Sequence, residues 1–174
     1  MQAFSRKGFQ LRAASLETRL AYSSFLILCL LGIATLIALS FGRAGASPAA
    51  LATYYRGDDS EMHFPKTFWQ LVEVSHFHLF TIPVVMLILA HLLYATPTSS
   101  RFRVVLTLVV FAGAFLDALG PWAIRYVSGA LAPALMLGWV LLGGGSIVIV
   151  LLTLIAMWAP ERWMAPFATR SEEP

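Results

Sequence analysis

Four long stretches of this sequence carry almost no charge, and they constrain the fold more than any other feature. Glu73 is the only formal charge in the second stretch, and Asp117 and Arg125 are the only charges in the third. About 20 apolar residues in an α-helix cross the roughly 30 Å hydrocarbon core of a bilayer, so each stretch is long enough to cross once. We therefore predict an all-α integral membrane protein with four transmembrane helices, at about residues 20–42, 67–95, 104–127 and 131–158.

The composition supports a membrane protein and excludes several other classes. Hydrophobic residues make up 59% of the chain and charged residues 12%, against about 25% charged residues in soluble domains. The single cysteine, Cys29, lies in an apolar run, which excludes an internal disulfide and a cysteine-based metal cluster. A formal net charge of +3 on such an apolar chain fits lipid headgroups better than nucleic acid. We expect the lipid bilayer as a partner and no nucleic acid.

The basic residues predict the orientation of the chain. Eight fall on one side of the predicted spans: Arg6, Lys7, Arg12, Arg19, Arg101, Arg103, Arg162 and Arg170. Four fall on the other side: Arg43, Arg56, Lys66 and Arg125. By the positive-inside rule, both termini are cytoplasmic and the loop at 43–66, which also holds Asp58, Asp59 and Glu61, is periplasmic. We expect a multi-pass protein of the bacterial inner membrane.

The whole chain, 1–174, is expected to form a single membrane domain. It has a cytoplasmic N-terminal segment at 1–19, a periplasmic loop at 43–66 and a cytoplasmic tail at 159–174. The N-terminal segment mixes apolar and basic residues, so it is either an interfacial amphipathic helix or a disordered tail. Because the extramembrane segments are short and no nucleophile is placed beside a base, we expect no catalytic activity of its own.

Ionisable residues at bilayer depth are the candidate functional residues, since each is costly there unless it has a partner or water. They are Glu73, His76, His78, His91 and Asp117. At 1.5 Å per residue, Glu73, His76 and Asp117 lie at similar depth in the outer half of the membrane, and His91 lies roughly 22 Å deeper than His76.

Helical phase divides the histidines of the second predicted helix. At 100° per residue, Glu73 and His91 coincide and His76 is about 60° away, whereas His78 points about 140° from Glu73. We therefore expect Glu73, His76 and His91 to share one face and His78 to lie nearly opposite. Pro83 is expected to kink this helix, which weakens the separation without reversing it.

Haem b is one interpretation of this pattern. His76 and His91 are two histidines about four turns apart on one face, the arrangement by which b-type membrane cytochromes hold two haems. Such a haem usually needs a second axial ligand from another helix, and the first, third and fourth predicted helices contain no histidine. That ligand would have to be Met136 or another methionine, His63 from the loop, or a histidine of a partner subunit.

A divalent transition metal is a second interpretation, and a structural role is a third. Glu73 and His76 form an i, i+3 pair of the kind that holds metals in helical bundles. Asp117 lies at matching depth, and His63 could reach down from the loop, which would complete a mixed carboxylate and imidazole site. Alternatively, these groups hydrogen-bond one another and bind nothing. Quinone binding, proton relay and transport remain further alternatives.

The segment FWQLVEVSHFHLFTIPVVMLILAHLL, residues 68–93, resembles a group of small bacterial inner-membrane proteins with four helices. Their second helix carries a Glu-x-x-His-x-His pattern, matched here by Glu73, His76 and His78, with Asp117 in FLDALGPW as a further candidate. The resemblance implies the neighbourhood of a cytochrome-containing electron-transfer system.

The sequence therefore predicts a small accessory membrane subunit of a bacterial respiratory or photosynthetic electron-transfer assembly. Other membrane subunits, such as a cytochrome-containing complex, are its expected partners. The alternative is a stand-alone membrane protein that binds a metal or a b-type haem through Glu73 and His76 on the periplasmic side.

Overall fold

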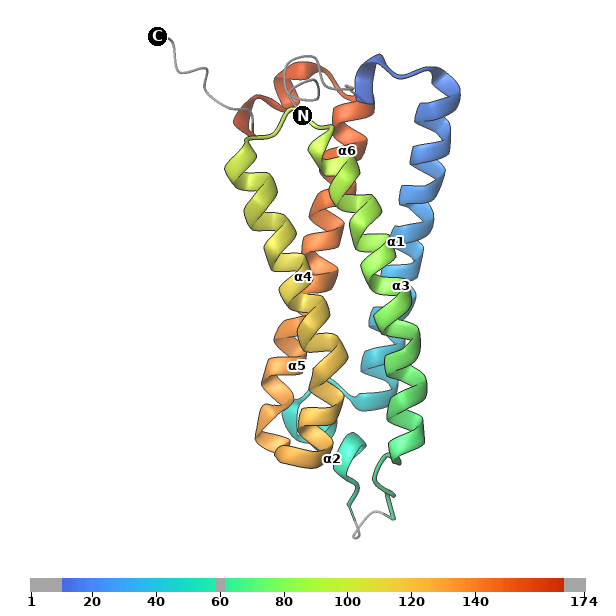
Figure 1. The fold of residues 1–174 in the computed structure, drawn as a ribbon, viewed down its shortest axis with the longest axis vertical. Helices are drawn as coiled ribbons and strands as arrows, with labels where there is room; N and C mark the ends of the chain where they lie inside the picture. The colour runs from blue at the N-terminus through green and yellow to red at the C-terminus, as the bar shows by residue number, and fades with distance from the viewer. Residues whose placement is uncertain (1–10, 59–61, 168–174) are drawn as a thin grey trace.

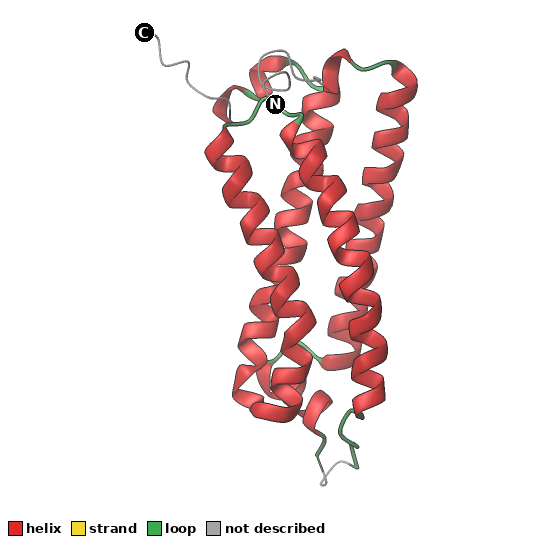
Figure 2. Ribbon diagram, in the orientation of Figure 1, coloured by secondary structure: helices red, strands yellow, loops and turns green. Residues whose placement is uncertain are grey.

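A computed structural model describes residues 11–58 and 62–167, and all the named elements in these ranges are helical (Figure 2). The long elements, in chain order, are α1 (Leu16–Ala44), α2 (Pro48–Arg56), α3 (Phe68–Tyr94), α4 (Ser100–Trp122), α5 (Ala132–Trp139) and α6 (Gly145–Trp158). The short ones are η1 (Leu11–Ala13), η3 (Ala123–Val127), η4 (Gly129–Leu131), η5 (Val140–Gly144), η6 (Glu161–Trp163) and η7 (Ala165–Phe167). Of these, η3 and η5 are π-helical turns and the others are 3₁₀ turns.

The prediction of four transmembrane helices is confirmed. Four helical segments of the described chain are long and apolar enough to cross a membrane: Leu16–Ala44, Phe68–Tyr94, Ser100–Val127 and Gly129–Trp158. They run up and down in a bundle (Figure 1), and the first and last described segments, η1 and η7, both lie at the end opposite α2. We call these two ends of the bundle the terminal end and the α2 end. The fourth span is not one regular α-helix, because the π-helical turn η5 separates α5 from α6.

Polar side chains cap the first turns of α1, α3 and α4. The Thr67 hydroxyl accepts a hydrogen bond from the backbone N–H of Gln70, whose side chain accepts one from the Thr67 N–H in return. Ser15 and Ser99 cap α1 and α4 through their hydroxyl oxygens. Each cap satisfies a backbone donor that the first turn of a helix leaves without a partner.

The N-terminal prediction is only partly covered by the structure. Residues 1–10, 59–61 and 168–174 lie outside the described chain, and so do Arg6, Lys7, Asp59, Glu61 and Arg170. Within the described part, α1 begins at Leu16, four residues before the predicted span, and therefore contains Arg19. The Arg19 guanidinium donates to the backbone carbonyl of Met157 and lies 3.9 Å above the ring of Trp158. These contacts join α1 to the end of α6.

Two apolar clusters form the core. One, toward the terminal end, joins α1, α3, α4 and α6 around Leu26, Leu89 and Val110. The other, at the α2 end, contains Leu51 and Ile124. Along the chain, Asp117 of α4 lies between Val110 of the first cluster and Ile124 of η3, which belongs to the second.

Glycine permits a close helix crossing within the bundle. A Cβ at Gly113 would collide with the backbone nitrogen of Leu142 and would lie 2.9 Å from the carbonyl oxygen of Gly138. A Cβ at Gly138 would lie 2.7 Å from the Cβ of Leu116 and 3.2 Å from the backbone nitrogen of Asp117. Without side chains at these two positions, α4 packs directly against α5 and η5, as small residues allow in membrane bundles.

The helix α2 was not predicted, because residues 43–66 read as a loop. Ser47 caps its first turn, Pro48 opens it, and Gly57 ends it with a φ of 80°. Leu51 is fully buried in the cluster at the α2 end. The Arg56 guanidinium donates to the backbone carbonyls of Ile124 (3.1 Å) and Arg125 (3.3 Å), which fastens α2 to η3.

Candidate ligand-binding site

A histidine and a carboxylate meet between α3 and α4, near the α2 end of the bundle. The Nδ1 atom of His78 lies 2.7 Å from Oδ2 of Asp117. Asp117 is buried, and 27% of the His78 side chain is exposed. An ionised carboxylate only accepts hydrogen bonds, so the Nδ1–H of His78 donates to it.

A tryptophan on α5 completes the hydrogen bonding of Asp117. The indole Nε1–H of Trp139 donates to Oδ1 of Asp117 at 3.1 Å. The two carboxylate oxygens therefore each accept from a different helix, which satisfies a group that would be costly at this depth without partners. The close α4 crossing at Gly138 brings Trp139 and Asp117 together, since Gly138 precedes Trp139 in the chain.

The contact with Asp117 uses only one imidazole nitrogen of His78, and the second nitrogen, Nε2, is left for another hydrogen bond or a ligand. In the described part of the chain, Nε2 of His78 has no hydrogen-bond partner, although the ring is fixed through Nδ1. A carboxylate that accepts from one ring nitrogen sets the orientation of the imidazole and makes the other nitrogen a better ligand or acceptor. Nε2 is thus the atom of His78 that is available to a ligand.

A cavity of about 280 Å³ lies beside this pair, and we call it the polar cavity. It is bounded by α1, α2, α3, α4 and α5. Its polar lining includes Arg43, Tyr55, Lys66, Glu73, His78 and Asp117. A mixed polar and apolar cavity with a few convergent polar groups is the usual form of a small-molecule site.

Two tyrosines of α2 shape the wall of the polar cavity nearest the loop. Nζ of Lys66 lies 4.1 Å from the centre of the Tyr54 ring, a cation–π contact that holds the lysine at the edge of the cavity. Burial raises the pKa of the Tyr55 phenol well above its ordinary value, and electrostatic interactions with Tyr54 and Asp117 add to the effect. The Tyr55 hydroxyl therefore stays neutral and available for hydrogen bonding.

An apolar cavity of about 380 Å³ adjoins the polar cavity, and we call it the apolar cavity. It lies between α1, α3, η5 and the start of α6. Leu36, Ser40 and Trp139 line both cavities, so the two cavities are adjacent. Gly32 and Gly143 also line the apolar cavity, and a Cβ at either would have no neighbour closer than 3.9 Å.

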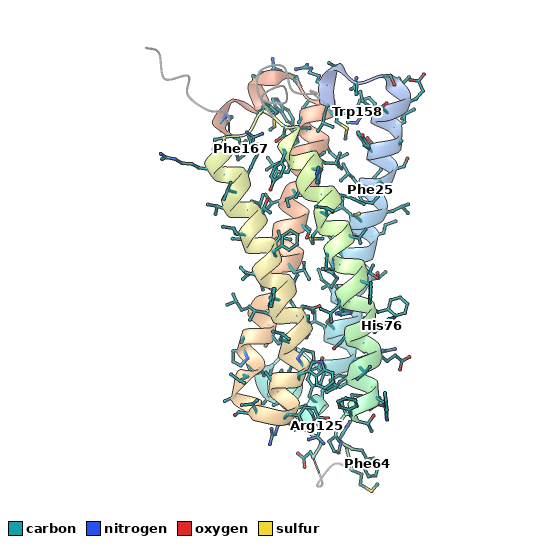
Figure 3. The ribbon with its side chains drawn as sticks, viewed as in Figure 1. Phe25, Phe64, His76, Arg125, Trp158 and Phe167 are labelled. Carbon is teal, nitrogen blue, oxygen red and sulfur yellow. The ribbon has the colours of Figure 1, made fainter. Side chains whose placement is uncertain are left out.

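The structure does not bring Glu73, His76 and Asp117 together as a metal-ligand group, and Asp117 contacts His78 instead. Glu73 is exposed, and it reaches the site only as part of the cavity lining. His76 is exposed on the outer face of α3 (Figure 3), where its ring lies 5.1 Å from the ring of Phe80. His78 does lie on a different face from Glu73 and His76, as helical phase predicts, but that face is the one turned toward Asp117.

The other two candidate ligands lie elsewhere. His91 is exposed near the terminal end, and its Nδ1 donates to the backbone carbonyl of Leu87 at 2.7 Å. His63 belongs to the loop, where its backbone pairs with that of Asp58. Within the ranges 11–58 and 62–167, no three His, Cys, Asp or Glu side chains are grouped so that they could hold a metal ion. The described residues therefore do not assemble the predicted metal-ligand set, and the haem interpretation stays a prediction.

A seven-residue spacing in the sequence could have identified His78 as the inward histidine. Leu71, His78, Val85 and Leu92 are each seven residues apart, which returns to nearly the same side of a helix. Leu71 and Leu92 are buried, whereas Val84 and Leu87, on the side of Glu73 and His76, are exposed. No such signal marks the other residues of the site. Trp139, which donates to Asp117, belongs to a different span, and Tyr55, which lines the polar cavity, belongs to a helix that was not predicted.

One comparison with known proteins is informative. A family model described as a transmembrane helical domain matches residues 45–163, more than half of the chain, from just before α2 to the end of η6. No significant match was found among curated proteins or among solved structures. The matched region contains His78, Asp117, Trp139 and Tyr55, whereas α1 precedes it. The chain therefore belongs to this family of transmembrane helical domain proteins.

Proposed function

We propose that this protein is a small, non-catalytic subunit of a bacterial electron-transfer assembly, and that it binds a small molecule through His78. Its place would be the bacterial inner membrane, with the α2 end on the periplasmic side. The single observation that carries the binding role is the 2.7 Å contact between His78 Nδ1 and Asp117 Oδ2, which leaves Nε2 for a ligand in the polar cavity.

The cost of the polar pair supports a role in binding. An ionisable side chain inside a bilayer is by default a candidate functional residue. If His78, Asp117 and Trp139 served only to join three helices, apolar side chains could replace them without loss of stability. An oriented imidazole beside a cavity is the arrangement that ligand binding requires.

The electron-transfer setting rests on a separate argument. The segment 68–93 resembles small membrane proteins that accompany cytochromes, and its Glu73, His76 and His78 match their pattern. The described segments outside the spans are short, and the longest helix among them is α2 with nine residues. A chain that is almost entirely membrane helix is better suited to bind a ligand or contact other subunits within the membrane than to catalyse a reaction in the aqueous phase.

The test is to isolate the chain with whatever it binds. A tagged full-length chain is extracted from its native membranes in mild detergent, and reduced-minus-oxidised spectra are recorded with mass spectrometry of proteins and of small molecules. We expect a haem-containing protein at constant stoichiometry and a small molecule retained by the chain. His78→Ala should lose the small molecule, whereas His76→Ala, on the outer face of the same helix, should keep it.

Two results would contradict the proposal. Equal loss from the two histidine variants, or retention by both, would remove His78 as the binding residue. A chain that purifies alone, without any haem-containing protein, would remove the electron-transfer assembly as its setting.

A further inference from the structure

We infer that the ligand is an isoprenoid quinone, with its ring in the polar cavity and its tail in the apolar cavity. The inference rests on the proposed function, since it names the class of molecule that His78 binds. It concerns binding only. Three features of the two cavities lead to it: they are adjacent, they differ in polarity, and the polar cavity presents particular hydrogen-bonding atoms.

The two cavities are neighbours. The polar cavity and the apolar cavity share the lining residues Leu36, Ser40 and Trp139, so a ligand that occupies both passes these side chains. Their volumes, about 280 Å³ and about 380 Å³, each lie near the lower end of the range for small-molecule sites. A molecule that fills both has a compact head and an extended tail.

The lining of the apolar cavity fits a hydrocarbon tail. Its walls are mostly Leu, Ile, Val, Phe and Met side chains of α1 and α3, with the face of η5 opposite. The Ser146 hydroxyl donates to the backbone carbonyl of Leu142 at 2.5 Å and is therefore already satisfied. Gly32 and Gly143 leave room where a side chain would otherwise project. An isoprenoid chain fits these mainly apolar walls, whose other hydroxyl groups belong to Ser40 and Thr81.

The polar atoms of the other cavity fit a neutral ring with oxygen substituents. Neutral His78 offers Nε2 as an acceptor for a quinol hydroxyl, and protonated His78 offers it as a donor to a quinone carbonyl. The Tyr55 hydroxyl, also without a hydrogen-bond partner in the described chain, provides a second group on the wall formed by α2. Both forms of one redox couple can therefore bind.

The buried carboxylate argues against an anionic head beside His78. Asp117 lies 2.7 Å from the imidazole, so a phosphate or carboxylate at Nε2 would face a second negative charge in a medium of low dielectric. The basic side chains that could compensate, Arg43 and Lys66, belong to the ends of the spans, and Lys66 already lies against the Tyr54 ring. A phospholipid headgroup is thus less suited to the inner position than a neutral quinone.

The experiment measures quinone binding to the purified full-length chain in lipid nanodiscs. Decylubiquinone and the tail-less duroquinone are titrated while tryptophan fluorescence is followed, because Trp139 lies at the junction of the cavities and quinones quench indole emission. His78→Ala is compared with His76→Ala. Gly143→Leu, which fills the apolar cavity, is compared with Gly144→Leu, whose side chain points away from it into open space.

The expected result has two parts. His78→Ala raises the Kd for both quinones at least about tenfold, because each loses the hydrogen bond to Nε2, and His76→Ala leaves both unchanged. Gly143→Leu raises the Kd for decylubiquinone about tenfold but not that for duroquinone, and Gly144→Leu changes neither. The glycine pair still decides the question if His78→Ala fails to fold.

Other outcomes separate this inference from the proposed function. If wild-type protein does not bind decylubiquinone but retains another small molecule that His78→Ala loses, the quinone is wrong and the binding role stands. A b-type haem spectrum from the isolated chain would be one such outcome. If Gly143→Leu and Gly144→Leu have equal effects, the tail does not lie in the apolar cavity and the inference fails. If no small molecule depends on His78, both proposals fail.

Discussion

Asp117 joins three helices through one carboxylate, since it accepts from His78 on α3 and from Trp139 on α5 while belonging to α4. Removing it leaves two donors in an apolar surrounding, and hydrogen bonds between membrane helices contribute up to about 1–2 kcal/mol each. The two hydrogen bonds of Asp117 decide whether the carboxylate and its donors are satisfied, and hence whether the polar cavity beside them keeps its shape.

We predict that Asp117→Ala lowers the free energy of unfolding by about 1–3 kcal/mol, because both donors lose their acceptor. The measurement is thermal or SDS-induced unfolding of the purified protein, followed by circular dichroism. Glu73→Ala is the control: this acid is exposed and should change stability by less than about 0.5 kcal/mol. Equal effects of the two substitutions would mean that the pair with His78 does not stabilise the bundle.

Tyr55 gives a prediction for alkaline pH. Because burial raises the pKa of its phenol in the folded state, the unfolded chain releases this proton more readily. The stability that the neutral phenol contributes is therefore present below pH about 10 and falls as the pH rises above that value. Unfolding of wild type and Tyr55→Phe, measured across alkaline pH, should show a smaller loss of stability in the variant. Identical profiles would contradict the raised pKa.

The sequence identified the ionisable residues at this scale, but it did not predict the contact between His78 and Asp117. Charge inside an apolar span marked Glu73, His76 and Asp117, yet it carries no information about which residues face lipid. In a soluble helix an exposed face is polar, whereas here the exposed side of α3 carries Phe80 and Leu87. The periodicity of polar residues therefore does not indicate the inner face of α3, whereas the seven-residue spacing of Leu71, His78, Val85 and Leu92 does.

At the scale of elements, glycine determines which helices pack tightly. Gly113 and Gly138 place α4 against α5 and η5, whereas α1 has only 6% of its most apolar 18-residue stretch buried, against 50% for the fourth span. The bundle thus consists of a closely packed part, built from α4, α5 and α6, and of a helix α1 that lies against it more loosely. Both cavities lie along that loose contact.

We predict that Gly113→Ala destabilises the protein by about 1–3 kcal/mol, because its Cβ would force α4 away from the backbone of Leu142. Gly144→Ala is the matched control, since nothing lies within 4 Å of the Cβ it would add. Alanine is the better helix former, so the control should be neutral or stabilising by up to about 1 kcal/mol. Thermal unfolding of both variants measures the difference, and a neutral Gly113→Ala would contradict the close crossing.

Hydropathy predicted the four spans to within a few residues, because length and apolar character are sufficient to define a membrane helix. It did not predict α2 or the π-helical turn η5. The run PAALATYYR has a helix start and stop, but its small and aromatic residues also suit a loop, and only Leu51 is fully buried. η5 depends on tertiary contacts of the LLGG sequence with α4, which a single chain sequence does not reveal.

At the scale of the whole molecule, the topology is open to a direct test. The excess of basic residues at the terminal end predicts that this end is cytoplasmic. A reporter that is active only in the periplasm should be inactive when fused after Pro174 and active when inserted in the loop at 43–66. The reverse pattern would invert the protein in the membrane and would place the polar cavity on the cytoplasmic side.

The loose contact of α1 has a consequence for how the cavities respond to the bilayer. One wall of each cavity is formed by a helix whose outer side chains meet acyl chains, and this helix precedes the region that matches the family. The volume enclosed behind α1 is therefore set partly by the lateral pressure of the surrounding lipids. Lipids that exert a higher lateral pressure at mid-depth would reduce the volume of the two cavities, and bilayers with a lower lateral pressure would increase it. Membrane composition would then affect how tightly this protein binds a ligand.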